Sequence, residues 1–175
     1  CNLTDRIAAL AGFMVGRMRA GLAHVNIVAS MLFGGVTGSA VADAAATGSM
    51  MIPAMKSQGY PAGYSAAVTA ASSVIGSIIP PSTLMIVYGF LTGVSTGRLF
   101  LGGVIPGILV GLALMLVAHI QAVRLGIGHD HDDRPRTFAT FWSIAKDSGP
   151  AMLVPVVIIG GIVGGFFTPT EAALV

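Results

Sequence analysis

Long stretches without any charged side chain, separated by short polar segments, set the pattern of this chain. No Asp, Glu, Lys or Arg occurs in residues 20–42, 57–97, 99–123 or 148–170. A helix that crosses a bilayer needs about 20 consecutive, mostly apolar residues. These stretches therefore predict several membrane-embedded helices, and the fold class that they predict is an all-α, polytopic membrane protein.

The first stretch predicts a re-entrant helical hairpin over residues 21–58. Its first arm, residues 21–33, is apolar but short, and apolar segments of about 10 to 14 residues are typical of re-entrant or buried helices rather than of spanning ones. The glycine-rich run at 34–39 disfavours helix and is expected to form the tip. A second helical arm follows the tip and ends near Lys56.

The second stretch predicts a broken transmembrane helix over residues 61–92. Its beginning is rich in Ala, Ser and Thr, as tightly packed membrane helices are. The consecutive prolines Pro80 and Pro81 remove two backbone donors, and a residue that precedes proline is disfavoured in helical geometry. We expect the helix to unwind over residues 76–82 and to restart near Ser82.

The remaining residues predict further membrane segments on either side of one polar loop. Residues 98–124 and 148–167 are each expected to form a transmembrane helix, and residues 125–147 a cytoplasmic loop with an interfacial amphipathic helix. Residues 1–20 have the pattern of the end of a preceding helix, and residues 168–175 that of the start of the next one. Because the chain lacks an initiating Met and ends within a helical pattern, we expect a fragment of a longer protein.

The basic residues predict which side of the membrane each segment faces. A hairpin that enters and leaves on one side, followed by two crossings, leaves only Arg98 on the opposite side. The positive-inside rule makes the side with the other basic residues cytoplasmic. That side carries the following residues: Arg17, Arg19, Lys56, Arg124, Arg134, Arg136 and Lys146.

Composition narrows the function classes. Only 9% of the residues are charged, against about 25% in soluble domains, so a fully water-facing surface is excluded. The basic residues are scattered and lack an aromatic-interleaved patch, which argues against nucleic acid as a partner. Cys1 is the single cysteine, which rules out an intramolecular disulfide and a thiolate zinc cluster. The His- and Asp-rich run at 129–133 is better explained as a solvated loop than as a metal site.

Asp43 is the main candidate for chemistry, because it is the only acidic residue between Arg6 and His129. An ionisable residue at membrane depth is by default a functional candidate. An equally weighted alternative is that Asp43 caps the helix after the tip by accepting backbone N–H groups. The two helix breaks favour an ion site, since unwound carbonyls with Ser and Thr hydroxyls can hold sodium and half-helix N-termini suit a carboxylate. The simpler alternative for the breaks is that they are packing kinks.

Four motifs carry a family resemblance. These are GGVTGSAVADAAA at residues 34–46, IPAMK at 52–56, IIPPS at 78–82 and FTPTEAA at 167–173. In this order they resemble the large (M, DctM-like) subunit of tripartite ATP-independent periplasmic (TRAP) transporters. The resemblance implies an elevator-type fold in the bacterial inner membrane. It also implies a non-enzymatic function, the sodium-coupled import of small organic acid anions of the C4-dicarboxylate or sialic acid type.

The resemblance also implies partners and site residues. The partners are a small four-helix membrane subunit, a periplasmic substrate-binding protein, the organic acid anion and membrane lipid, with sodium as the coupling ion. The second hairpin would lie outside this chain, and the substrate, the number of sodium ions and a possible fusion of the small subunit are not specified by the sequence. The ion- and substrate-site residues expected from the two breaks are Gly35, Thr37, Gly38, Ser39, Asp43, Gly76, Ser77, Pro80 and Ser82.

Three alternatives stay open at this point. A divalent-anion/sodium symporter has a similar architecture but needs no binding protein. An intramembrane aspartyl protease needs two carboxylates that share a proton, whereas Asp43 is the only carboxylate expected at depth. A purely structural membrane anchor would not need two helices broken by glycine and proline.

Overall fold

The computed structural model describes residues 20–127 together with residues 157, 160 and 161, and it confirms the predicted all-α class over this part of the chain. The predictions for residues 1–19, 128–156 and 162–175 lie outside the described residues. The elements are, in chain order, α2 (Gly21–Thr37), α3 (Ala40–Ser57), α4 (Ala62–Ser73), the 3₁₀ helix η1 (Val74–Ser77), α5 (Thr83–Thr92) and α6 (Thr96–Leu125).

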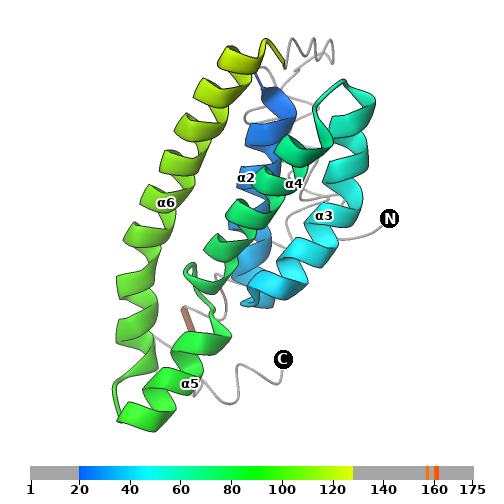
Figure 1. Cartoon of the computed structure of the whole chain (residues 1–175). Coiled ribbons are helices and arrows are strands. Elements are labelled where there is room, and N and C mark those ends of the chain that lie inside the picture. The colour runs from blue at the N-terminus through cyan, green and yellow to red at the C-terminus, as the bar shows by residue number, and fades with distance from the viewer. Residues whose placement is uncertain (1–19, 128–156, 158–159, 162–175) are drawn as a thin grey trace, which may run out of the picture.

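Helix α2 lies at the centre of the arrangement, where it packs against α3, α4, η1 and α6. In Figure 1, α2 and α3 run side by side, α4 lies against them, and α6 extends along the whole unit, with α5 beside its beginning. Apolar side chains of α2 such as Ile27 join the buried cluster, together with Met55 of α3 and Val68 of α4. The Tyr64 hydroxyl of α4 donates a hydrogen bond of 2.8 Å to the Ala118 carbonyl oxygen of α6, which ties these two helices together.

The turn between α2 and α3 is shorter than the sequence predicts. Helix α2 continues through the first glycines to Thr37, so only Gly38 and Ser39 lie outside a helix. Gly38 has φ 60 and therefore occupies the left-handed region that favours glycine. A glycine within a helix costs about 1 kcal/mol relative to alanine. This cost is offset because Gly34 packs directly on the backbone of Gly76.

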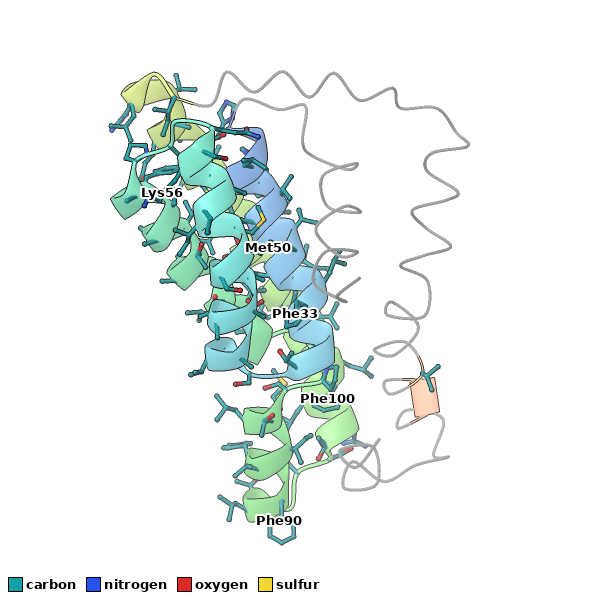
Figure 2. The ribbon with its side chains drawn as sticks, turned by 90° about the vertical axis from the view of Figure 1, so that its right-hand side faces the viewer. Phe33, Met50, Lys56, Phe90 and Phe100 are labelled. Carbon is teal, nitrogen blue, oxygen red and sulfur yellow. The ribbon has the colours of Figure 1, made fainter. Side chains whose placement is uncertain are left out.

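The two ends of the unit differ in charge. Figure 2 shows Lys56, near the end of α3, far from Phe90 in α5. The C-terminal ends of α3 and α6 lie at the same end of the unit (Figure 1). Lys56 and Arg124 therefore share one end, while Arg98 is in the first turn of α6 at the other. This is the arrangement that the positive-inside argument requires, but the orientation itself stays a prediction.

Helix α6 is the one described helix that is long and apolar enough to cross a membrane, with a mean hydropathy of 2.4. Its outer face is apolar and exposed, as lipid contact requires. The exposed residues include Leu101, Ile105, Leu109, Leu112 and Leu116. Helix α5 and the first part of α2 are apolar but shorter. That α2 and α3 form a re-entrant hairpin stays a prediction.

The inner face of α6 carries a row of glycines that contacts the broken helix and α2. Gly103, Gly107 and Gly111 are buried. A Cβ atom on Gly103 would lie 2.6 Å from the carbonyl oxygen of Ile78, and one on Gly107 would lie 2.5 Å from the side chain of Ile79. Small residues allow helices in a membrane to approach closely. Gly103 and Gly107 therefore hold the unwound segment close to α6, whereas Gly111 packs against Met31 of α2.

We expect Gly103→Ala to lower the thermal stability of the purified protein, by about 1–3 kcal/mol in unfolding free energy, because a methyl group overpacks a tight contact. Gly102→Ala is the matched control. A Cβ atom there meets nothing within 4 Å, so the change is expected to be neutral, or stabilising by up to about 1 kcal/mol through helix propensity. Equal melting temperatures for the two variants would show that the close approach does not matter.

Candidate functional site

The two helix interruptions, between α2 and α3 and between α4 and α5, lie next to each other and are connected by a backbone hydrogen bond. The amide nitrogen of Thr83, at the start of α5, donates a hydrogen bond of 3.3 Å to the carbonyl oxygen of Gly38. A Cβ atom on Gly38 would lie 2.6 Å from the carbonyl oxygen of Pro81, and one on Gly34 would lie 2.5 Å from the Cα atom of Gly76. The turn of the hairpin and the unwound segment thus form one junction, and only glycine allows this approach.

Two helices begin at the junction, each capped by a serine. The Ser39 hydroxyl accepts a 3.4 Å hydrogen bond from the amide nitrogen of Ala42 at the start of α3. The Ser82 hydroxyl accepts one of 3.4 Å from the amide nitrogen of Met85 in α5, and it donates a hydrogen bond of 2.7 Å to the carbonyl oxygen of Ser77. The N-termini of α3 and α5, which are the positive ends of their helix dipoles, therefore both lie at the junction.

Asp43 lies one turn into α3, and its side chain is 0% exposed. A Cβ atom on Gly76 would be 3.7 Å from the Cβ atom of Asp43 and 3.8 Å from the carbonyl oxygen of Ser39, so the Asp43 side chain leaves α3 next to Gly76 of the broken helix. Neither carboxylate oxygen makes a hydrogen bond within the described residues. The cap of α3 is Ser39 and not Asp43, so helix capping does not account for the aspartate.

The hydroxyl groups of Ser30 in α2 and Ser73 in α4 lie next to the Asp43 carboxylate, but neither is in hydrogen-bonding geometry with it. Ser73 instead donates to the carbonyl oxygen of Thr69 at 2.7 Å, and the Ser30 hydroxyl is paired with that of Ser72 at 3.1 Å. These serines were not predicted from the sequence. For Ser73, the available signal was the helical spacing of hydroxyl residues along α4.

The structure places the predicted site residues in different parts of this region. Ser39, Asp43 and Gly76 lie together at the junction, where Gly38 packs against Pro81 and Thr83. Ser82 caps the helix that leaves the junction. The hydroxyls of Thr37 and Ser77 bond locally, to the carbonyl oxygens of Phe33 at 3.4 Å and Val74 at 2.8 Å. Pro80 is fully buried in the unwound segment. Gly35 lies within α2.

The oxygen atoms at this junction are ligands of the kind that suits a monovalent cation. Asp43 is the only acidic residue in the described part of the chain, and no group of three His, Cys, Asp or Glu side chains comes together there. The His- and Asp-rich run at 129–133 lies outside the described residues. One carboxylate with surrounding hydroxyl and carbonyl oxygens supplies a single negative charge and neutral oxygen ligands.

Comparison with known proteins agrees with the motifs. The chain matches, over residues 1–175, the family described as the DctM component of tripartite ATP-independent periplasmic transporters. It is 46% identical over 99% of its length to the "Uncharacterized protein YgiK" of Salmonella typhimurium, of which it covers 40%. It is also 42% identical to the isethionate TRAP transporter permease protein DctMQ of Oleidesulfovibrio alaskensis, over 98% of this chain and 27% of that protein.

A third relative is the sialic acid TRAP transporter large permease protein SiaM of Vibrio cholerae, 41% identical over 99% of this chain and 40% of SiaM. The chain thus spans less than half the length of each of these relatives. The family match nevertheless covers every residue given. The chain therefore belongs to the DctM component family of tripartite ATP-independent periplasmic transporters.

Proposed function

We propose that this chain is part of a permease that imports a small organic acid anion together with sodium. The anion would be delivered by a periplasmic binding protein, and a small four-helix membrane subunit would complete the permease. Two relatives are named for the transport of isethionate and sialic acid, both of which are anions at neutral pH. Import of an anion into a negatively charged cell needs an energy source, and a sodium gradient supplies one.

The observation that carries the proposal is the buried, unpaired carboxylate of Asp43. Burial of an ionised carboxylate without a partner costs several kcal/mol, so a fold retains such a group only where something offsets the cost. A bound cation does so directly. Sodium is a hard cation that takes oxygen ligands, and broken helices in transporters supply such ligands through freed carbonyls and hydroxyls.

The geometry also supports a coupling mechanism. A cation held at Asp43 would bind between the turn that joins α2 to α3 and the 3₁₀ helix η1 at Gly76, and it would tie these two elements together. The amide groups at the starts of α3 and α5 would then be held in fixed positions. Helix N-termini bind anions such as carboxylates through free N–H groups and the helix dipole. Sodium binding would therefore prepare the site for the anion.

The direct test is uptake by proteoliposomes that contain the full-length permease, its small membrane subunit and the binding protein encoded with them. Radiolabelled sialic acid, isethionate and succinate serve as probes. We expect uptake of one probe to require both an inward sodium gradient and the binding protein. Equal uptake with potassium in place of sodium would contradict sodium coupling. Sodium-driven uptake of free substrate without the binding protein would instead support the divalent-anion/sodium symporter alternative.

Membrane orientation is tested with two matched serine-to-cysteine changes. Ser57 ends α3 and Ser95 precedes α6, at opposite ends of the unit (Figure 1), and both are exposed. In a permease without other reactive cysteines, we expect Ser57→Cys to be labelled by a membrane-impermeant thiol reagent only from the cytoplasmic side. Ser95→Cys should be labelled only from the periplasmic side. Labelling of both from one side would contradict the predicted orientation.

A further inference from the structure

We propose that Ser30 and Ser72 are positioning residues that keep the Asp43 carboxylate free for the cation. They do so because their hydroxyl protons point along a chain of hydrogen bonds that leads away from the carboxylate. This inference rests on the proposed function, since it concerns the same sodium site. The chain of bonds, termed here the serine relay, consists of Ser30, Ser72 and the carbonyl oxygen of Thr69.

The direction of the serine relay follows from counting protons. The Ser30 and Ser72 hydroxyl oxygens are 3.1 Å apart, and the Ser72 hydroxyl donates to the carbonyl oxygen of Thr69 at 3.1 Å. A hydroxyl group has one proton to donate and two lone pairs that accept. Both hydrogen bonds exist together only when Ser30 donates to Ser72 and Ser72 donates to Thr69. The Ser30 proton is then not available to Asp43.

The other hydrogen-bond donors near Asp43 also donate to acceptors other than its carboxylate. Ser73 donates to the carbonyl oxygen of Thr69 at 2.7 Å. The Thr69 hydroxyl donates to the carbonyl oxygen of Ser65 at 2.9 Å and accepts a 2.7 Å bond from the side-chain amide of Asn26. Asn26 in α2 thus joins the hydroxyl network of α4. The hydroxyl oxygens beside Asp43 therefore present lone pairs rather than protons.

This orientation matters because a cation competes with hydrogen-bond donors for the lone pairs of the carboxylate oxygens. A hydrogen bond to a charged group is among the stronger ones in proteins. If Ser30 donated to Asp43, it would use a lone pair and withdraw charge that the cation needs. Side chains of Ser30 and Ser72 are 0% exposed, so bulk water does not supply an alternative acceptor for the Ser30 proton. Without Ser72, the Ser30 hydroxyl still lies next to the Asp43 carboxylate, which can then accept its proton.

The test is a double-mutant cycle in the full-length permease assembled with its small subunit. Sodium binding is read from the rise in melting temperature as sodium chloride replaces choline chloride, which is independent of transport. Ser72→Ala is expected to raise the half-saturating sodium concentration about threefold or more, because Ser30 turns its proton to Asp43. In a Ser30→Ala background, the same Ser72→Ala change is expected to have no effect, since no proton is left to turn.

Ser65→Ala is the matched control, because Ser65 is also a buried hydroxyl of α4 but bonds to the carbonyl oxygen of Pro61. It should leave the sodium titration unchanged. An equal shift by Ser72→Ala in both backgrounds, or no shift in either, would overturn the serine relay. Should Ser72→Ala not insert into the membrane, Ser72→Cys carries the test, because a thiol is a weak acceptor of similar size.

Failure of the relay is distinguishable from failure of the sodium site itself. If Asp43→Asn changes the sodium titration while Ser72→Ala does not, the site stands and the relay is wrong. If Asp43→Asn leaves the titration unchanged, the carboxylate is not part of a sodium site, and the proposed function loses the observation that carries it.

Discussion

Asp43→Asn is expected to raise the sodium concentration for half-maximal uptake at least tenfold. Asn keeps the size of the side chain and one carbonyl oxygen, but it removes the only negative charge at the junction of the two breaks. A tenfold change corresponds to about 1.4 kcal/mol, which is just below the roughly 1.5–3 kcal/mol that a single hydrogen bond to a charged group contributes. The measurement is sodium-titrated uptake in proteoliposomes with the complete transporter.

Two controls distinguish loss of the negative charge of Asp43 from damage to the fold. A buried neutral amide costs less than a buried unpaired carboxylate, so Asp43→Asn is expected to insert and to melt at the same temperature or higher in sodium-free buffer. Thr47→Val is the matched variant one turn further along α3. Thr47 is buried, and its hydroxyl donates only to the Asp43 backbone carbonyl at 2.7 Å. A normal sodium titration for Asp43→Asn, or an equal shift for Thr47→Val, would remove the carboxylate from the ion site.

Gly34→Ala is expected to lower uptake more than tenfold while membrane insertion persists. The added Cβ atom would lie 2.5 Å from the Cα atom of Gly76 and 3.3 Å from its nitrogen. Backbone atoms cannot move aside by changing rotamer, so α2 and η1 must separate. Because the Cβ atom of Asp43 also lies beside Gly76, the separation would also widen the proposed ion site. Uptake at saturating sodium and the amount of permease in the membrane are both measured.

Gly63→Ala is the control for this change. Gly63 lies in α4, and a Cβ atom there meets nothing within 4 Å. The replacement is expected to keep full uptake, with a gain in stability of up to about 1 kcal/mol from helix propensity. If Gly34→Ala transported as well as Gly63→Ala does, the contact between the two breaks would not be needed for function.

The positions of both helix breaks could be predicted because they depend on local backbone chemistry. Pro80 and Pro81 lack amide protons and restrict the residues before them, and the helix is interrupted there as expected. The glycine run was harder to interpret. Propensity alone placed the break over all of residues 34–39, whereas packing against Gly76 kept α2 helical as far as Thr37. Tertiary contact thus overrode a local preference of about 1 kcal/mol per glycine.

The sequence also identified Asp43 as the residue to explain, since an isolated acid in a neutral region is visible without any structure. It left open whether the carboxylate caps a helix or binds an ion. The structure decides this point in part, because Ser39 is the cap and both Asp43 oxygens are without a hydrogen bond in the described residues. Occupancy by sodium stays a proposal.

The sequence by itself therefore determined the family, the all-α class, the two breaks and the isolated acid, because each depends on residues close together along the chain. Only the tertiary structure decided which breaks meet and which hydroxyls surround the carboxylate. Ser30 and Ser72 are far apart along the chain, and nothing local distinguishes them from other small polar residues of packed membrane helices. Their pairing beside Asp43 arises because α2 and α4 pack against each other. The direction of their hydrogen bonds then follows from the single proton that each hydroxyl carries.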